Sequence, residues 1–296
     1  MSWSVTPEWD GHRADKVLAH LSKRSRAAVR RALEDATVLL SGTAVQPRHR
    51  VAVGDEFAGE IPVLHHPLEP EPVPFLVVFE DSDVAVVDKP AGVMTHPGAG
   101  RRTGTLAGGL LDRWPHIRGV GVEDRWGIVH RLDRDTSGLL AIALTSEAYA
   151  GLSDAIRRRD VTREYFCLVT GAPASPTGTI EAPIARDPRR PTRMRVDSLG
   201  RQAVTHYRVE RSWSDSALLR VKLETGRTHQ IRVHMASIGL PIAGDRSYGR
   251  GGGRHRLFLH ATRLAFSHPV TGEAIDVESP LPEDLASLLP PTDERA

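Results

Sequence analysis

The amino-acid sequence predicts an α+β protein in which a small N-terminal α/β domain precedes a larger domain built around a largely antiparallel sheet. Two observations favour this class. Apolar runs of strand length recur from position 75 onward without regularly alternating helices, which argues against a doubly wound parallel sheet. Before position 59 the pattern is instead two short helices followed by a turn signal. We therefore expect domains at 1–58 and 75–290, joined by a linker at 59–74.

The N-terminal domain is strongly basic. The chain as a whole has a net charge of only +2, but nine Lys and Arg stand against three acids between Arg13 and Arg50. Apolar spacing predicts a helix over 15–21 and a second helix that begins after an N-cap at Ser25. The polar side of the second helix carries Arg26, Arg30 and Arg31, and Arg24 lies just before the helix. Because acids are scarce among them, we expect a phosphate-binding stripe rather than a merely solvated face.

A turn and a linker follow the two helices. Ser41-Gly42-Thr43 separates two apolar stretches, 38–40 and 44–45, which predicts a small hairpin. Residues 55–74 contain five acids and five prolines but no Lys or Arg. Because proline interrupts helices and favours extended chain, we expect a semi-stiff linker.

The larger domain shows six strand patterns and two helix patterns. The strands are expected at Leu76–Phe79, Val84–Val87, Leu139–Leu144, Tyr165–Val169, Val204–Val209 and Leu218–Leu223. One helix is expected from Ser146, as its cap, to Arg158, with an apolar stripe along one side. The other is expected from Thr228 to Ile238, because Gly239 is a typical helix end.

The segment 130–140 concentrates charge beside an apolar run. In an extended chain Arg131, Asp133 and Asp135 would share one side, with a turn at 136–138 before a buried strand. A carboxylate with a guanidinium nearby is either a structural ion pair or a catalytic acid. On charge alone the structural pair is the commoner of the two.

The string His130-Arg131-Leu132-Asp133, followed by Thr136-Ser137-Gly138, resembles the active-site motif of the RluA-like family of pseudouridine synthases, which act on large-subunit rRNA and tRNA. Five further segments match in the family's order: Val87-Asp88-Lys89-Pro90-Ala91-Gly92, His96-Pro97-Gly98, Arg163-Glu164-Tyr165, the stretch 224–234, and Leu259-His260-Ala261. The resemblance runs from about position 75 to about 282 and implies a pseudouridine synthase fold. The basic N-terminal segment resembles an S4-type RNA-binding domain, although Ser41-Gly42 stands where related domains often have Asn-Gly.

The resemblance also implies roles for individual residues. Asp133 matches the catalytic carboxylate, and Tyr165 matches the tyrosine that stacks on a uridine flipped out of the RNA. Arg227 matches the arginine that pairs with the aspartate and would keep it ionised. Arg131 matches the arginine that fills the vacated space, and His130 is expected to contact RNA beside it. Whether Asp133 attacks C1′, attacks the base or removes a proton is left open, and Asp135 is expected to be structural.

Two loops complete the expected RNA surface. The stretch 186–195 has five arginines against one acid, and its prolines predict a loop. We expect Arg189, Arg190 and Arg193 to contact phosphates. The glycine-rich stretch 249–254 lacks the Lys-Ser/Thr of a nucleotide phosphate loop, so a surface loop is expected there.

No cofactor or metal is expected. The isomerisation consumes no group, and His229 and His234 are five residues apart, which is not the spacing of a zinc pair. No run approaches the roughly 18 apolar residues of a membrane span, and no secretory signal is evident. Cys167 is the single cysteine, which excludes internal disulfides and suits a cytoplasmic protein. A monomer is expected.

The sequence therefore predicts an RNA pseudouridine synthase whose target is 23S rRNA, with tRNA as the second choice. The alternative from another class is an RNA-binding ribosome-assembly factor with a silent site. A glycosidase that uses Asp133 and Asp135 is disfavoured, since carboxylates on one strand do not flank a sugar.

Overall fold

The computed structural model describes residues 1–22, 24, 26–61, 68–98, 102–249 and 255–291. It divides into two compact units, Met1–Pro67 and Leu68–Ala296. The expected N-cap Ser25, the middle of the expected linker and most of the glycine-rich loop lie outside the described residues. Among the helices that are described, none combines the length and the apolar character that a membrane crossing requires.

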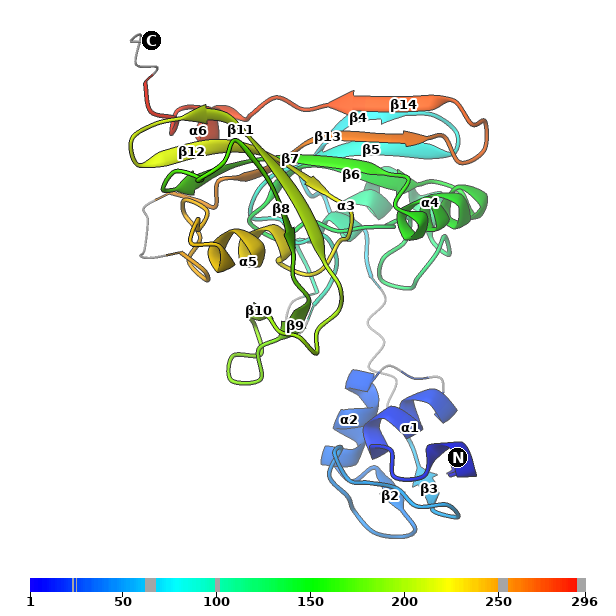
Figure 1. Cartoon of the computed structure of the whole chain (residues 1–296). Helices are drawn as coiled ribbons and strands as arrows, with labels where there is room; N and C mark the ends of the chain where they lie inside the picture. Colours follow the sequence, from blue (N-terminus) through cyan, green and yellow to red (C-terminus); the bar gives the residue numbers. More distant parts are fainter. Residues whose placement is uncertain (23, 25, 62–67, 99–101, 250–254, 292–296) are drawn as a thin grey trace. The chain divides into compact units, whose positions relative to one another are not determined.

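The first unit packs two helices against a three-stranded antiparallel sheet (Figure 1). Its elements are β1 (Ser2–Ser4), the 3-10 helix η1 (Pro7–Trp9), α1 (Ala14–Ser22), α2 (Arg26–Glu34), β2 (Val38–Leu40) and β3 (Glu56–Gly59), with strand order β1-β3-β2. Both helices form where the apolar spacing predicts them. Their apolar faces, with Leu18, Val29 and Leu33, share a core with Phe57 of β3.

The expected hairpin forms only its turn. Ser41 and Gly42 have φ values of 46° and 80°, which is typical of a type I′ turn. Leu40 and Thr43 exchange two backbone hydrogen bonds of 2.9 and 2.8 Å across it. The expected second strand at 44–45 does not form, and β2 pairs with β3. That pairing places Leu40 opposite the fully buried Phe57, whereas Ala44 is exposed.

The expected linker is largely packed at both ends. Ile61 is buried in the core of the first unit, and Leu68 is buried in the core of the second. A Glu71 carboxylate oxygen accepts the Gly104 N–H at 2.5 Å, which ties the proline-rich stretch to the second unit. Between these ends only 62–67 lies outside the described residues.

The second unit is built on a nine-stranded sheet. Its strands are β4 (Leu76–Glu80), β5 (Val84–Lys89), β6 (Ser137–Ala143), β7 (Thr162–Thr170), β8 (Thr177–Glu181), β11 (Val204–Ser212), β12 (Ser216–Leu223), β13 (Leu259–Ser267) and β14 (Ala274–Glu278). The order is β4-β5-β6-β13-β7-β12-β11-β8, with β14 also paired to β13. Among these described strands only β6 and β13 run parallel. The expected largely antiparallel α+β sheet is confirmed, and all six expected strands form within three residues of their expected bounds.

Helices lie on one side of this sheet in Figure 1, where α3, α4 and α5 are all drawn below it. Their bounds are α3 (Leu106–Arg113), the 3-10 helix η2 (Pro115–Ile117), α4 (Ser146–Arg158), α5 (Gln230–Ser237) and α6 (Glu283–Ala286). The cap of α4 is Thr145 rather than Ser146, since the Thr145 hydroxyl accepts the Ala148 N–H at 3.2 Å. A two-stranded ribbon, β9 (Ile184–Arg186) and β10 (Met194–Val196), projects beyond α5.

Gly138 allows the close approach of β6 and β13. Its φ is 115°, and a Cβ at this position would lie 2.3 Å from the Ala261 carbonyl oxygen. Residues with a side chain avoid this backbone region. The glycine therefore fixes where β13 meets the start of β6, five residues after Asp133.

We expect Gly138→Ala to lower the free energy of unfolding by at least about 3 kcal/mol, through the strained φ and the clash with the Ala261 carbonyl. Urea denaturation followed by tryptophan fluorescence measures this. Gly98→Ala is the control, because a Cβ there meets nothing within 4 Å. Equal stability of the two variants would contradict the assignment.

Candidate active site

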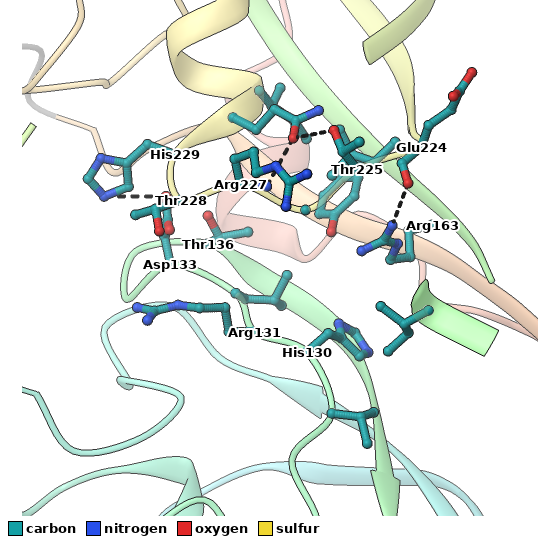
Figure 2. A pocket seen from close by; sticks show the side chains of 18 of the residues that line it. His130, Arg131, Asp133, Thr136, Arg163, Glu224, Thr225, Arg227, Thr228 and His229 are labelled. Carbon is teal, nitrogen blue, oxygen red and sulfur yellow. Dashed lines mark hydrogen bonds and ion pairs between the residues drawn. The ribbon is translucent and has the colours of Figure 1, made fainter. Parts of the chain in front are cut away.

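A pocket of about 540 Å³ in the second unit brings the principal expected site residues together. Asp133, Tyr165, Arg227, Arg131 and His130 all line it, and Figure 2 shows four of them by label. The arginines expected to bind RNA from α2 and from the 186–195 loop do not line it.

The chain around Asp133 is not the extended strand expected from alternation. Residues Arg134 and Asp135 form a turn, and β6 begins at Ser137. The Asp135 carboxylate therefore leaves the side of Asp133 and pairs with the exposed Arg134 beside it, at 2.9 Å. The turn is imposed by a contact distant in sequence, since the Gly92 N–H donates to the Arg134 carbonyl at 2.8 Å.

Two buried side chains hold the backbone on either side of Asp133. The Thr95 hydroxyl donates to the Leu132 carbonyl at 2.7 Å and accepts the Leu132 N–H at 3.2 Å. On the other side, the fully buried Lys89 donates to the Arg134 carbonyl at 3.2 Å and to two carbonyls of the loop before Thr95, each at 2.8 Å. Burial lowers the pKa of Lys89 to about 7. These hydrogen bonds fix the backbone around Asp133 and so the direction in which its side chain points.

Arg232 is the ion-pair partner of Asp133. Its NH1 donates to Asp133 Oδ2 at 3.0 Å, while Nε and NH2 grip both oxygens of the fully buried Asp245 at 2.8 and 2.9 Å. Burial alone lowers the pKa of Arg232, but the two carboxylates outweigh it and the net shift is upward. In the same way, burial raises the pKa of Asp245, and Arg232 reverses the shift.

The pairing expected for Arg227 is therefore wrong. Arg227 does line the pocket, but its Nε donates to the Gln202 carbonyl at 3.0 Å. Its pKa is lowered by burial and then by the like charges of Arg201 and Arg159. Arg227 lies among cations rather than beside Asp133.

The position at which α5 begins explains why Arg232, rather than Arg227, pairs with Asp133. The helix begins at Gln230, two residues later than expected, and the Gln230 side chain accepts the Arg227 N–H at 3.0 Å. Arg227 thus belongs to the preceding turn. His229, with a left-handed φ of 56°, is three residues before Arg232, which is one helical turn. Its Nε2 lies 3.9 Å from Asp133 Oδ2.

His229 is oriented from behind by Tyr248. The Tyr248 hydroxyl oxygen accepts the Met194 N–H of β10 at 2.8 Å, and the hydroxyl contacts His229 Nδ1 at 2.8 Å. With Nδ1 as the acceptor, Nε2 carries the hydrogen and faces Asp133. The Tyr248 ring also packs against two guanidiniums, of Arg232 at 5.1 Å and of Arg193 at 6.0 Å.

Tyr165 and His130 both line the pocket. Tyr165 is 5% exposed, and burial raises its pKa. His130 Nε2 accepts the Ala141 N–H of β6 at 3.0 Å, and burial followed by the charge of Arg163 lowers its pKa to about 3. The neutral His130 ring thus has a structural contact with β6 that the sequence did not indicate.

Arg131 lines the pocket with an exposed side chain. Its NH1 donates to His96 Nε2 at 3.0 Å. This acceptor is available because the other ring nitrogen of His96 donates to the Pro97 carbonyl, at 2.9 Å.

The arginines of α2 have acidic partners that the sequence analysis discounted. Arg30 and Arg31 pair with acids four residues later at 3.5 and 3.3 Å, and Arg26 reaches the buried Asp15 of α1 at 2.9 Å. Acids are therefore interleaved in space. Arg24 and the three paired guanidiniums are still exposed, so phosphate binding by this face stays a prediction.

The 186–195 stretch is a ribbon tip rather than a plain loop. β9 and β10 pair through Arg186 and Met194, and the connection carries Arg189 and Arg190, both exposed. Arg193 is half-buried against Tyr248. Its expected contact with phosphate stays a prediction.

One cluster among the described residues has donor atoms close enough for a metal ion: Asp81, Asp83 and His268. His268 Nδ1 accepts the N–H groups of Val270 and Thr271 at 3.3 and 3.0 Å. The hydrogen of the neutral ring is then on Nε2, which faces Asp81 at 3.1 Å. A neutral ring so arranged has no lone pair left for a metal, and the cluster does not line the pocket.

The site also includes three residues that the sequence patterns did not indicate: Arg232, Asp245 and Thr136. Arg232 could have been found, because an arginine inside the apolar helix run 231–235 needs a buried partner. Thr136 lines the pocket with a buried hydroxyl that has no hydrogen-bond partner among the described residues.

A half-buried carboxylate paired with an arginine, in one pocket with a buried tyrosine on this sheet, defines an enzyme of the pseudouridine synthase class. The sequence profile described as RNA pseudouridylate synthase matches residues 83–237. The chain belongs to this family and is an isomerase that converts uridine in RNA to pseudouridine.

The similarity to individual relatives extends over nearly the whole chain. The chain is 40% identical to an uncharacterised RNA pseudouridine synthase of Bacillus subtilis, over 97% of this chain and 96% of the relative. It is 42% identical to a ribosomal large subunit pseudouridine synthase D of Xanthomonas campestris, over 94% and 88%. The solved structure of human RNA pseudouridylate synthase domain containing 1 matches with a TM-score of 0.57 and 29% identity, over 71% of this chain and 84% of that one.

We expect Arg232→Gln to lower the free energy of unfolding by about 3–5 kcal/mol, because it leaves two carboxylates without their shared cation. Arg227→Gln, in the same motif, should cost less than about 1 kcal/mol. Urea denaturation of both variants measures the difference. Equal losses would show that Arg232 has no special place in the site.

Proposed function

We propose that this chain isomerises specific uridines of large-subunit (23S) rRNA, with Asp133 as the catalytic carboxylate. The observation that carries the proposal is the setting of Asp133. Its Oδ2 is held by Arg232, while Oδ1 has no hydrogen-bond partner among the described residues and the side chain lines the pocket. Relatives named ribosomal large subunit pseudouridine synthase D support the rRNA target.

The reaction defines what the pocket must do. The bond between uracil N1 and ribose C1′ breaks, the base turns, and C5 joins C1′. An oriented carboxylate with one unoccupied oxygen can act as the nucleophile or as the base in such a sequence. The arrangement of Asp133 suits either role.

The target uridine must leave the RNA stack to reach Asp133. We infer that Tyr165 stacks on the flipped base, and that the exposed Arg131 occupies the space it leaves. Arg227, with its neighbours Arg159 and Arg201, makes one side of the pocket basic. This side suits the RNA backbone, so we assign Arg227 to substrate binding rather than to the ion pair of Asp133.

We propose that the protein acts as a monomer, in which one chain supplies Asp133, Arg232 and Tyr165 to the pocket. We also infer a cytoplasmic location, where ribosomal RNA of a bacterial type is modified. A tRNA target and a ribosome-assembly role without catalysis are the competing functions, and the experiments below separate them from the proposal.

We expect Asp133→Asn to bind unmodified large-subunit rRNA with wild-type affinity and to form no pseudouridine. Tritium release from RNA labelled at uridine C5 and carbodiimide primer extension measure the activity. Asp135→Asn, whose side chain does not line the pocket, should be close to wild type.

Cellular mapping adds the identity of the RNA. Deletion of the gene should remove pseudouridines from large-subunit rRNA, and wild type but not Asp133→Asn should restore them. Full activity of Asp133→Asn would sink the catalytic assignment. If deletion removed pseudouridines from tRNA alone, the substrate would be tRNA rather than rRNA. If the wild-type protein bound RNA but released no tritium, the ribosome-assembly role would be favoured.

We expect the double substitution of Arg30 and Arg31 by Gln to weaken RNA binding without changing kcat. Each lost phosphate contact should reduce the slope of log affinity against log salt by about 1. Filter binding across a salt series measures the slope. An unchanged slope would mean that Glu34 and Asp35 already neutralise these arginines.

A further inference from the structure

Arg163 is a buried cation whose donors are largely unused. It lies on β7 two residues before Tyr165, so both side chains project from one face of the strand. Arg163 is 6% exposed and lines the pocket. Of its five N–H donors, the hydrogen bond formed with a described residue is from NH2 to the Glu224 carbonyl, at 3.2 Å. Its Nε is buried without a partner among the described residues.

The carboxylates of the pocket are already engaged with other groups. Asp133 pairs with Arg232 at 3.0 Å, and Glu224 pairs with Arg159 and His206 at 2.8 and 2.7 Å. A guanidinium removed from water without a counter-charge costs several kcal/mol. Such a group is retained in a binding pocket when the ligand supplies the missing charge.

The turn before α5 leaves room for this side chain. A Cβ at Gly226 would lie 2.9 Å from Arg163 NH1, so a residue other than glycine would push the guanidinium aside. Arg163 is therefore seated in a space that the neighbouring turn keeps open.

We propose that Arg163 is a catalytic residue that stabilises the uracil ring while it is detached from the ribose. When the C1′–N1 bond breaks, its electron pair stays on N1 and the negative charge spreads to O2 and O4. C5 then supplies the pair for the new bond to C1′ and loses its proton, and N1 gains a proton. A cation fixed where this charge develops lowers the barrier more than it strengthens binding of the neutral base.

The position of Arg163 suits the base. In Figure 2, Arg163 and His130 lie at the end of the pocket opposite Asp133 and His229. After burial, the charges of Arg163 and then of Asp133 act on the pKa of Tyr165, so this ring lies within reach of both. A uracil stacked on Tyr165 with its glycosidic bond at Asp133 would direct its far edge toward Arg163.

Other arginines of the pocket are better placed than Arg163 to bind RNA phosphates. A phosphate in the chain stays joined to both neighbouring nucleotides and keeps much of its water. Exposed pocket residues such as Arg131 and Arg157 can meet it without desolvation. The buried Arg163 suits an anion that forms inside the pocket.

The test separates catalysis from binding. We expect Arg163→Gln to lower kcat about 100- to 1000-fold, with RNA affinity and its salt dependence unchanged, and Arg163→Lys to recover part of the loss. Arg208→Gln removes an exposed arginine that does not line the pocket, and it should keep the wild-type kcat. A weaker affinity with a salt slope reduced by about 0.7–0.9 and an unchanged kcat would assign Arg163 to a phosphate and overturn the proposal.

A second substrate distinguishes electrostatic stabilisation from a structural role. Fluorine at C5 stabilises the anionic base itself, so the defect of Arg163→Gln should shrink when the target is 5-fluorouridine. The readout is the loss of intact 5-fluorouridine from nuclease digests under single-turnover conditions. Equal defects with both bases would overturn the proposal.

This inference rests on the proposed role of Asp133, and the two can fail separately. Asp133→Asn tests whether the pocket is the catalytic site at all. If Asp133→Asn is inactive and Arg163→Gln turns over at the wild-type rate, the function stands and the role of Arg163 falls.

Discussion

The candidate active site depends on the need to compensate the charge of one largely buried cation. Arg232 lies in α5 between the buried Ile231 and Val233, where an unpaired guanidinium would destabilise the fold by several kcal/mol. Asp245 and Asp133 supply the counter-charges from two different segments. Because one planar group binds both, the helix and both segments must be placed together. The orientation of Asp133 is in this way a consequence of folding rather than a local property of its loop.

Much of the fold could be predicted because burial leaves a periodic record in sequence. The uniformly buried strand β6 is a continuous apolar run, and α4 has an apolar stripe. The strand β13 was missed, because Leu259–Ser267 contains His260, Thr262 and Arg263. Two of these are buried polar residues whose hydrogen bonds come from distant segments. Such partners leave no local signal, and short strands such as β8 lie in turn-rich sequence.

Asp133 and Tyr165 line one pocket, as the sequence predicted, but the ion-pair partner of Asp133 was predicted wrongly. Arg227 and Arg232 share one motif, and which of them reaches Asp133 depends on where α5 begins. That point is set by the Gln230 side chain, which binds the Arg227 N–H and the Thr225 hydroxyl. The apolar spacing of a helix carries no information about such a side-chain hydrogen bond, so it could not predict where α5 begins. The ion pair of Arg26 in α2 has a similar cause, since its partner Asp15 comes from another helix.

Tyr248 joins two regions that the sequence places far apart. Its hydroxyl binds the backbone of β10 and the ring of His229, and its ring packs against Arg193 and Arg232. The ribbon and the basic neighbours of Asp133 are therefore mechanically linked through one rigid ring. A displacement of the arginine-rich tip would therefore reach His229 and Arg232, the two neighbours of Asp133, through Tyr248.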